Sequence, residues 1–134
     1  MSVFVDTSFL VALLDEDDAR SSTAALLWEQ ASVAGRTILT TNYAVLECCA
    51  VLQRRLGVAA VRRLTRDLLA PVTLEWVTRA DHERALAALE VAGRRDLSLV
   101  DCVSFEVMRR LDLVDCLAFD THFDEQGFAR PDLG

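Results

Sequence analysis

The sequence contains no lysine. All 14 of its basic residues are arginine, against 21 aspartates and glutamates, which leaves a formal net charge of −7. An acidic chain of this kind does not bind nucleic acid through bulk electrostatic attraction. Binding in a local groove stays open, because metal ions there would neutralise carboxylates and because arginine pairs well with phosphate.

The sequence also lacks the patterns of a zinc site, a secreted protein or a membrane protein. Its cysteines form no CxxC pair and lie in apolar runs, which is typical of small buried side chains. The start of the chain has no basic segment of a signal peptide, and no apolar run approaches the roughly 18 residues that span a membrane. We therefore expect a soluble protein of a reducing cytoplasm. The four cysteines are Cys48, Cys49, Cys102 and Cys116.

Length and composition favour a single domain that covers residues 1–134 and has a sizeable core. Hydrophobic residues make up 52% of the chain, slightly above ordinary usage. In a small domain, such an excess favours a surface that is buried against a partner. No repeat, low-complexity tract or linker divides the chain.

Short apolar runs alternate with amphipathic stretches along the chain. This alternation predicts an α/β fold of three layers, α/β/α, around a mostly parallel sheet of four to five strands. The predicted strands are residues 3–5, 37–40, 73–77 and 116–119, with a short last strand at 128–130. The predicted helices begin near Phe9 and continue with residues 20–34, 43–56, 58–70, 81–92 and 99–111.

Four carboxylates stand in apolar surroundings, namely Asp6, Glu47, Asp101 and Asp120. Asp6 and Asp120 each follow a strand, whereas Glu47 and Asp101 lie in early turns of helices. An isolated buried carboxylate costs several kcal/mol unless it is paired, protonated or bound to metal. We expect this placement to gather all four at one edge of the sheet, where like charges are unstable without cations. Oxygen ligands without histidine or cysteine point to Mg²⁺ or Mn²⁺.

Three of these carboxylates also have a purely structural explanation. Asp6 would cap the first helix. Ser98 and Asp101 have the spacing of a capping box, and Asp120 would begin an Asx-turn. Glu47 has no such explanation, because it lies in mid-helix with no basic residue one helical turn away.

The motifs around these carboxylates, in this order and spacing, resemble those of a PIN domain over nearly the whole chain. Within that family the chain most resembles the compact VapC-type toxins of bacterial and archaeal toxin–antitoxin pairs. The motifs are Val5-Asp6-Thr7-Ser8, Glu47 in its apolar helix, Leu97-Ser98-Leu99-Val100-Asp101 and Phe119-Asp120-Thr121-His122-Phe123.

The resemblance implies a Mg²⁺- or Mn²⁺-dependent endoribonuclease that forms a homodimer and is inhibited by a cognate antitoxin protein. Asp6, Glu47, Asp101 and Asp120 match the family's four acidic positions. We expect the three aspartates to ligate the metal directly, and Glu47 to bind it through water or to act as a base. Supporting hydroxyls are expected from Thr7 or Ser8 and from Ser98.

Other polar residues near the motifs have two interpretations each. Asp96 and Asp124 would join the cluster, or be solvated loop residues, which is the favoured interpretation. His122 would touch substrate, or occupy a turn with no catalytic task, which is again favoured. The acidic turn at 15–18 is expected to be solvated. One arginine group would contact phosphate or form a solvated helix face, and the sequence favours neither; it comprises Arg54, Arg55, Arg62, Arg63 and Arg66.

Two functions compete with a ribonuclease. One is a binding or regulatory module whose acidic cluster holds a structural ion. It is disfavoured because all four acidic positions are filled. The other is a phosphatase or flap-type DNA nuclease, which is disfavoured because the chain has no insertion large enough to guide a flap.

Overall fold

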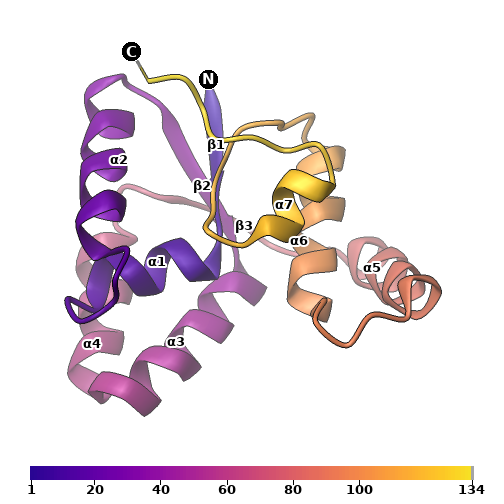
Figure 1. Cartoon of the computed structure of the whole chain (residues 1–134), viewed down its shortest axis with the longest axis horizontal. Helices are drawn as coiled ribbons and strands as arrows, with labels where there is room; N and C mark the ends of the chain where they lie inside the picture. Colours follow the sequence, from indigo (N-terminus) through magenta and orange to yellow (C-terminus); the bar gives the residue numbers. More distant parts are fainter. Residues whose placement is uncertain (134) are drawn as a thin grey trace.

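In the computed structural model, which describes residues 1–133, four parallel strands form one central sheet (Figure 1). They are β1 Ser2–Val5, β2 Thr37–Thr41, β3 Thr73–Glu75 and β4 Cys116–Leu117. Their order across the sheet is β3-β2-β1-β4, so the first strand of the chain lies in the interior of the sheet.

Helices cover both faces of this sheet. They are α1 Thr7–Leu14, α2 Ser21–Val33, α3 Asn42–Leu56, α4 Val58–Arg62, η1 Arg63–Leu68, α5 Arg79–Ala92, α6 Leu99–Arg110 and α7 Thr121–Glu125. Helices α1 to α4 lie on one side, and α6 and α7 lie on the other, with α5 packed against α6 (Figure 1). The predicted three-layer α/β/α fold is confirmed. None of these helices is long and apolar enough to cross a membrane.

The alternation of side chains along β1 explains why both faces are covered. Val3 and Val5 are fully buried against the first group of helices, together with residues such as Leu52. Phe4 points to the opposite face, where it stacks on Phe123 of α7 with ring centroids 6.3 Å apart. Successive strand residues point to opposite faces, and a parallel sheet needs cover on both.

The predicted helix at 58–70 is interrupted. After α4 the chain widens into the π-helical turn η1, and the Leu69 amide donates a hydrogen bond to the Leu64 carbonyl at 2.9 Å. A π turn brings residues five apart close to one face. Leu64, Leu68 and Leu69 all pack against the same core.

The C-terminal segment differs from the prediction in two places. Residues 121–125 form the short helix α7 where the sequence predicts a turn, and the predicted strand at 128–130 is reduced to a single bridge between Asp115 and Ala129. Phe128 packs on Phe105 and Phe123, with ring centroids 5.8 and 6.4 Å apart. This packing, rather than a longer strand ladder, fixes the segment.

The topology creates one switch point in the sheet. The chain steps outward from β1 to β2 and β3, and then returns to place β4 on the other side of β1. Val5 and Leu117 are paired in register, and the Asp6 amide donates to the Leu117 carbonyl at 3.0 Å. In open α/β sheets, ligands bind in the crevice at the carboxyl ends of the strands beside such a switch point. Asp6 and Asp120 follow the two strands that form it.

Candidate active site

Asp6 caps helix α1 where strand β1 ends. Its Oδ2 accepts hydrogen bonds from the Ser8 amide at 3.3 Å and the Ser8 hydroxyl at 2.8 Å. The same Ser8 Oγ accepts a hydrogen bond from the Phe119 amide at 3.2 Å. One hydroxyl therefore joins the ends of β1 and β4 and fixes the direction of the Asp6 carboxylate.

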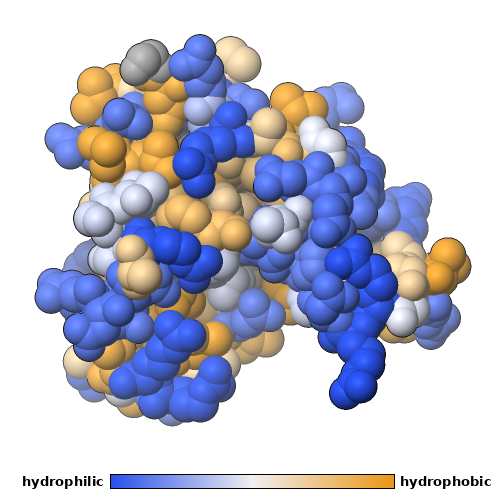
Figure 2. Space-filling model, viewed as in Figure 1, coloured by the Kyte–Doolittle hydropathy of each residue, from blue (hydrophilic) through white to orange (hydrophobic). Residues whose placement is uncertain are grey.

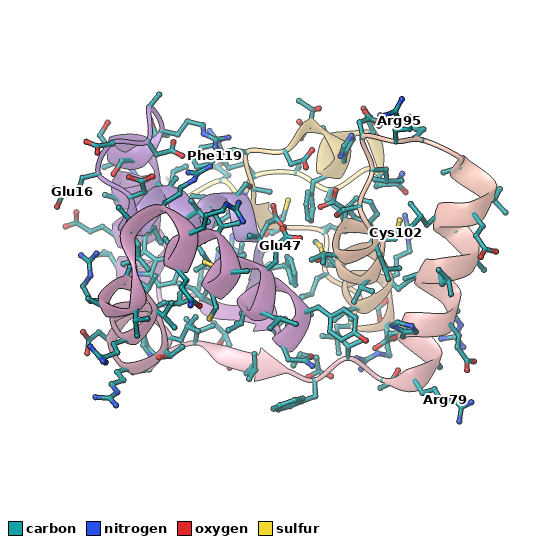
Figure 3. All side chains as sticks on the ribbon, turned by 90° about the horizontal axis from the view of Figure 1, so that it is seen from below. Glu16, Glu47, Arg79, Arg95, Cys102 and Phe119 are labelled. Carbon is teal, nitrogen blue, oxygen red and sulfur yellow. The ribbon has the colours of Figure 1, made fainter. Side chains whose placement is uncertain are left out.

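Thr7 joins helix α1 to helix α3. Its Oγ1 donates to the Ala44 carbonyl at 3.1 Å in buried surroundings. Helix α3 carries Glu47, which is half-buried and points toward the space between α3 and α6 (Figure 3). Both hydroxyls beside Asp6 thus have a structural task at the site: Ser8 orients the carboxylate, and Thr7 positions the helix that bears Glu47.

Asp101 occupies the first turn of helix α6. The predicted capping box is present, because the Asp101 amide donates to Ser98 Oγ at 3.0 Å and the Ser98 amide donates to Asp101 Oδ2 at 3.4 Å. Asp120 caps helix α7 and accepts the His122 amide at 2.9 Å. The structural explanations for Asp6, Asp101 and Asp120 are therefore correct, and capping aims these carboxylates into one cleft.

The four predicted carboxylates line a single cleft of ≈ 340 Å³ at the switch point. Asp6 and Asp101 are buried, with 3% and 7% of their surface exposed, whereas Glu47 and Asp120 are partly exposed. Asp101 and Asp120 come close enough, with His122, to offer one ligand atom each within 4.8 Å. Asp6 and Glu47 line the same cleft beside this group.

Burial and mutual repulsion raise the pKa values of these carboxylates. Burial, followed by the charge of Asp101, raises the pKa of Asp6 from 3.8 to about 7, against hydrogen bonds from Ser8 that lower it. Burial and the charge of Asp101 also raise the pKa of Glu47. Burial and the charge of Asp120 raise that of Asp101. The cluster is thus unfavourable as four bare anions, and a divalent cation would relieve the repulsion.

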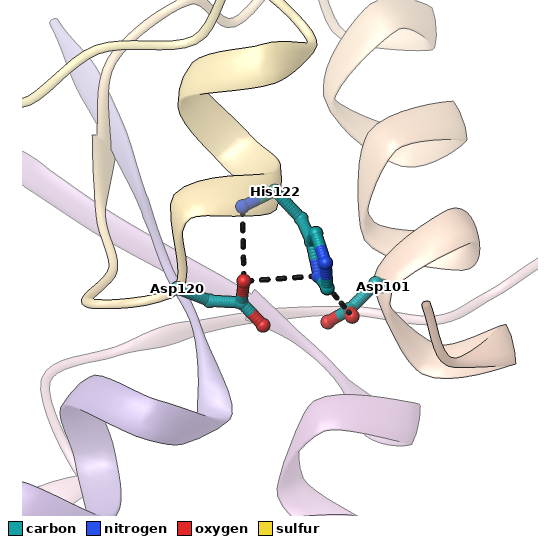
Figure 4. A group of neighbouring side chains, drawn as sticks. All are labelled: Asp101, Asp120 and His122. Carbon is teal, nitrogen blue, oxygen red and sulfur yellow. Dashed lines mark hydrogen bonds and ion pairs between the residues drawn. The ribbon is translucent and has the colours of Figure 1, made fainter. Parts of the chain in front are cut away.

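His122 lies beside this cluster in helix α7, so the predicted turn is wrong, whereas the absence of a catalytic task stays a prediction. It lies in the first turn of α7 with 8% of its surface exposed. Its Nδ1 is 3.0 Å from Asp120 Oδ1 and 3.4 Å from Asp101 Oδ2 (Figure 4). No local pattern in the sequence predicts this position, because it depends on where helix α7 packs against the rest of the fold.

Asp96 lines the cleft, whereas Asp124 does not. The Asp96 side chain is 63% exposed, as favoured, but it lies at the cleft rim and its Oδ2 is 3.2 Å from His122 Nε2. Arg94 holds both Asp96 oxygens, at 3.2 and 2.9 Å, and keeps the pKa of Asp96 well below its usual range. Asp124 is exposed and does not line this cleft.

Two arginines that line the cleft pair with the acidic turn at residues 15–18. Asp15 is 7% exposed and the Asp18 side chain is 9% exposed, so the prediction that the turn is solvated is wrong for both. Arg55 from α3 lies 3.3 Å from Asp15, and Arg20 lies 3.3 Å from Asp18. Both arginines line the cleft, and each is paired with an aspartate of the turn.

The donor set fits a divalent cation. Carboxylate oxygens from several elements converge on one cleft, as the hard ions Mg²⁺ and Mn²⁺ require. The buried Nδ1 of His122 has no hydrogen-bond partner among the described residues, although two carboxylates lie beside it. A cation between the ring and the two carboxylates would satisfy this atom.

The class of protein follows from a three-layer α/β/α fold whose parallel sheet carries an acidic cleft at its switch point. The family model described as PIN domain matches residues 3–129, and the chain belongs to that family. It is 38% identical over 128 residues to the 23S rRNA-specific endonuclease VapC20 of Mycobacterium tuberculosis, curated for two strains, and covers 95% of both chains.

Solved structures agree with this classification. The crystal structure of M. tuberculosis VapC20, described as a sarcin-ricin loop cleaving toxin, matches with a TM-score of 0.82 and 37% identity over 94% of this chain and 95% of that one. VapBC2 from Rickettsia felis, bound to a DNA fragment from its promoter, matches with a TM-score of 0.68 at 12% identity over 97% and 98% of the two chains. The second likeness shows the fold alone.

Proposed function

We propose that this protein is a metal-dependent endoribonuclease and the toxin of a type II toxin–antitoxin pair. The observation that carries the proposal is the convergence of four predicted carboxylates, from four separate elements, on one cleft at the switch point. The likeness to VapC20, whose name states that it is an endonuclease specific for 23S rRNA, supports RNA as the substrate.

The residues of the cleft have distinct roles in this proposal. Asp6, Asp101 and Asp120 would hold Mg²⁺ or Mn²⁺, an ion that lowers the pKa of bound water and stabilises charge on the phosphate when bound. Glu47 is half-buried, and its raised pKa suits a group that accepts the proton of the attacking water. Arg20 provides positive charge at the rim for the RNA backbone.

The proposed partners are a second copy of the chain and a cognate antitoxin. Helix α2 exposes Leu26 at 55% and Val33 at 82%, and apolar surface gathers over this part of the molecule (Figure 2). Exposed apolar surface of this kind favours association. The description of VapC20 as a toxin supports an antitoxin as one partner.

The test compares RNA with DNA. Purified 23S rRNA and a DNA of the same sequence would each be incubated with the protein and Mn²⁺ or Mg²⁺, and the ends of the products mapped. We expect internal cuts in RNA only, and none with Asp101→Asn. Equal cleavage of DNA would favour the DNA-nuclease alternative. Cleavage of neither, by protein that binds metal, would favour the module with a structural ion.

A further inference from the structure

The His122 ring lies between two carboxylates of the cleft, and its Nδ1 is within ion-pair distance of both. Helix α7 carries the ring toward the N-terminal end of α6, and the ring stands between Asp120 and Asp101 (Figure 4). Nine-tenths of its side chain is buried. Nδ1 is within 3.4 Å of both carboxylates, yet neither contact has the geometry of a hydrogen bond.

The hydrogen bond of the other ring nitrogen, Nε2, determines whether Nδ1 carries a proton in the neutral ring. Nε2 lies 3.2 Å from Asp96 Oδ2, and a carboxylate accepts a hydrogen bond but cannot donate one. Nε2 therefore carries a proton, and in the neutral ring Nδ1 presents a lone pair to the cleft. A proton on Nδ1 would make the ring a cation paired with Asp120 at 3.0 Å and Asp101 at 3.4 Å, and a metal ion between the three groups is the alternative. A cation placed between the three groups satisfies all of them.

The two separations from Nδ1 fit the coordination shell of a small divalent ion. Neighbouring ligands of an octahedral ion at about 2.1 Å are about 3.0 Å apart. The observed separations from Nδ1 are 3.0 Å to Asp120 and 3.4 Å to Asp101. The Asp96–His122 pair is also the arrangement common in metal sites, where a ligating histidine donates its second N–H to a carboxylate that orients the ring.

We propose that His122 Nδ1 is a ligand of the same metal ion as Asp101 and Asp120, and that it makes the site prefer Mn²⁺ to Mg²⁺. The inference rests on the metal dependence proposed above and deepens it, because the ligand set then contains nitrogen as well as oxygen. Mg²⁺ takes oxygen ligands and dehydrates reluctantly, so replacing one oxygen ligand by an imidazole nitrogen disfavours Mg²⁺ relative to the larger ion Mn²⁺. Asp96 is a positioning residue that acts through the ring.

The chain offers matched variants for a test by metal binding rather than by activity. His122→Gln keeps an amide near the Nε2 position, and with it the Asp96 contact, but leaves nothing at Nδ1. His122→Asn places an amide oxygen near the Nδ1 position. His82 is the only other histidine of the sequence, and its Nδ1 lies 2.8 Å from the Tyr43 hydroxyl. It does not line the cleft, so His82→Gln is the control.

The measurements are Mn²⁺ and Mg²⁺ affinities by calorimetry, and pulsed electron paramagnetic resonance of bound Mn²⁺. Wild type and His82→Gln should show coupling of Mn²⁺ to a directly bound ¹⁴N nucleus, and both His122 variants should lack it. We expect His122→Gln to weaken Mn²⁺ binding roughly 10-fold or more, and Mg²⁺ binding no more than about threefold. Melting curves without metal check that each variant is folded.

The outcomes separate this inference from the proposed function. Binding of Mn²⁺ by wild type without nitrogen coupling, or with unchanged preference in folded His122→Gln, would overturn the role of His122 and leave metal dependence intact. Binding of neither ion by wild type would overturn both. If His122→Gln does not fold, His122→Asn decides, since retained Mn²⁺ binding without nitrogen coupling supports the inference and retained coupling refutes it.

Discussion

Replacing Asp6 with Asn should stabilise the metal-free protein at neutral pH. Asp6 is 3% exposed, and burial with the charge of Asp101 raises its pKa from 3.8 to about 7. The folded state thus binds a proton on Asp6 more tightly than the unfolded state. The associated stability is fully present below about pH 4, and it is lost as pH rises to about 7.

The expected gain in the free energy of unfolding follows from the difference between the two pKa values of Asp6. A difference of one pKa unit between the folded and unfolded states corresponds to about 1.36 kcal/mol, so the interval from 3.8 to about 7 corresponds to about 4 kcal/mol. Asn is never charged, and its amide oxygen still accepts the hydrogen bonds that Ser8 donates to Asp6. Asp6→Asn should therefore match wild type near pH 4 and exceed its free energy of unfolding by up to about 4 kcal/mol above pH 7.

Urea unfolding between pH 4 and pH 8, in the presence of a chelator, measures this difference. Asp18→Asn is the matched control in the same cleft, because Arg20 lowers the pKa of Asp18 and the sign is reversed. Asp18→Asn should lose stability relative to wild type at pH 7 and approach it as pH falls. An advantage of Asp6→Asn that is absent at pH 7, or equal at every pH, would refute the reasoning.

Three further predictions concern metal, packing and association. Mn²⁺ at 100 times its dissociation constant should raise the free energy of unfolding of wild type by about 2.7 kcal/mol and that of Asp101→Asn by less, measured by thermal melting; no shift at millimolar metal would count against a preformed site. The Asp81 side chain is 1% exposed and accepts hydrogen bonds from Arg110 at 2.9 and 3.0 Å, which link α5 to α6. Asp81→Ala should therefore lower the free energy of unfolding in urea by about 2 kcal/mol, and a loss below about 0.5 kcal/mol would contradict this role. Sedimentation should show a dimer at micromolar concentration, and a monomer would sink the proposed homodimer.

The acidic cluster was predictable because its members are conspicuous in the sequence. Glu47 lies in an apolar helix with no partner one turn away, and Asp6 and Asp120 each end an apolar strand. Parallel strands bring such positions to one edge of the sheet by geometry alone. Local capping and convergence on the cleft turned out to be compatible, since the Ser98–Asp101 capping box also aims Asp101 at the site.

The position of His122 was not predictable in the same way, because it depends on contacts between distant segments. Helix α7 has five residues, and its place is set by Phe123, which packs on Phe4 and Phe105 from β1 and α6. No local pattern shows that packing. Long-range pairing likewise determines the burial of Asp15, whose arginine partner lies 40 residues away in α3.

The π turn at Arg63–Leu68 escaped prediction for a related reason. The sequence Leu64 to Leu69 satisfies a helical pattern, and nothing in it specifies a change from 3.6 to a wider turn. In the observed geometry, all three leucines of this segment pack in one core.

The central claim is that Asp6 helps to hold a catalytic metal for RNA cleavage. The most direct measurement is the single-turnover cleavage rate of one RNA substrate by wild type and by Asp6→Asn, at saturating Mn²⁺ or Mg²⁺ and again with a chelator. The account predicts cleavage by wild type only with metal, and a fall of about 10²-fold or more in folded Asp6→Asn, with RNA affinity changed much less. Equal rates for the two proteins, or undiminished cleavage by wild type in the chelator, would contradict it.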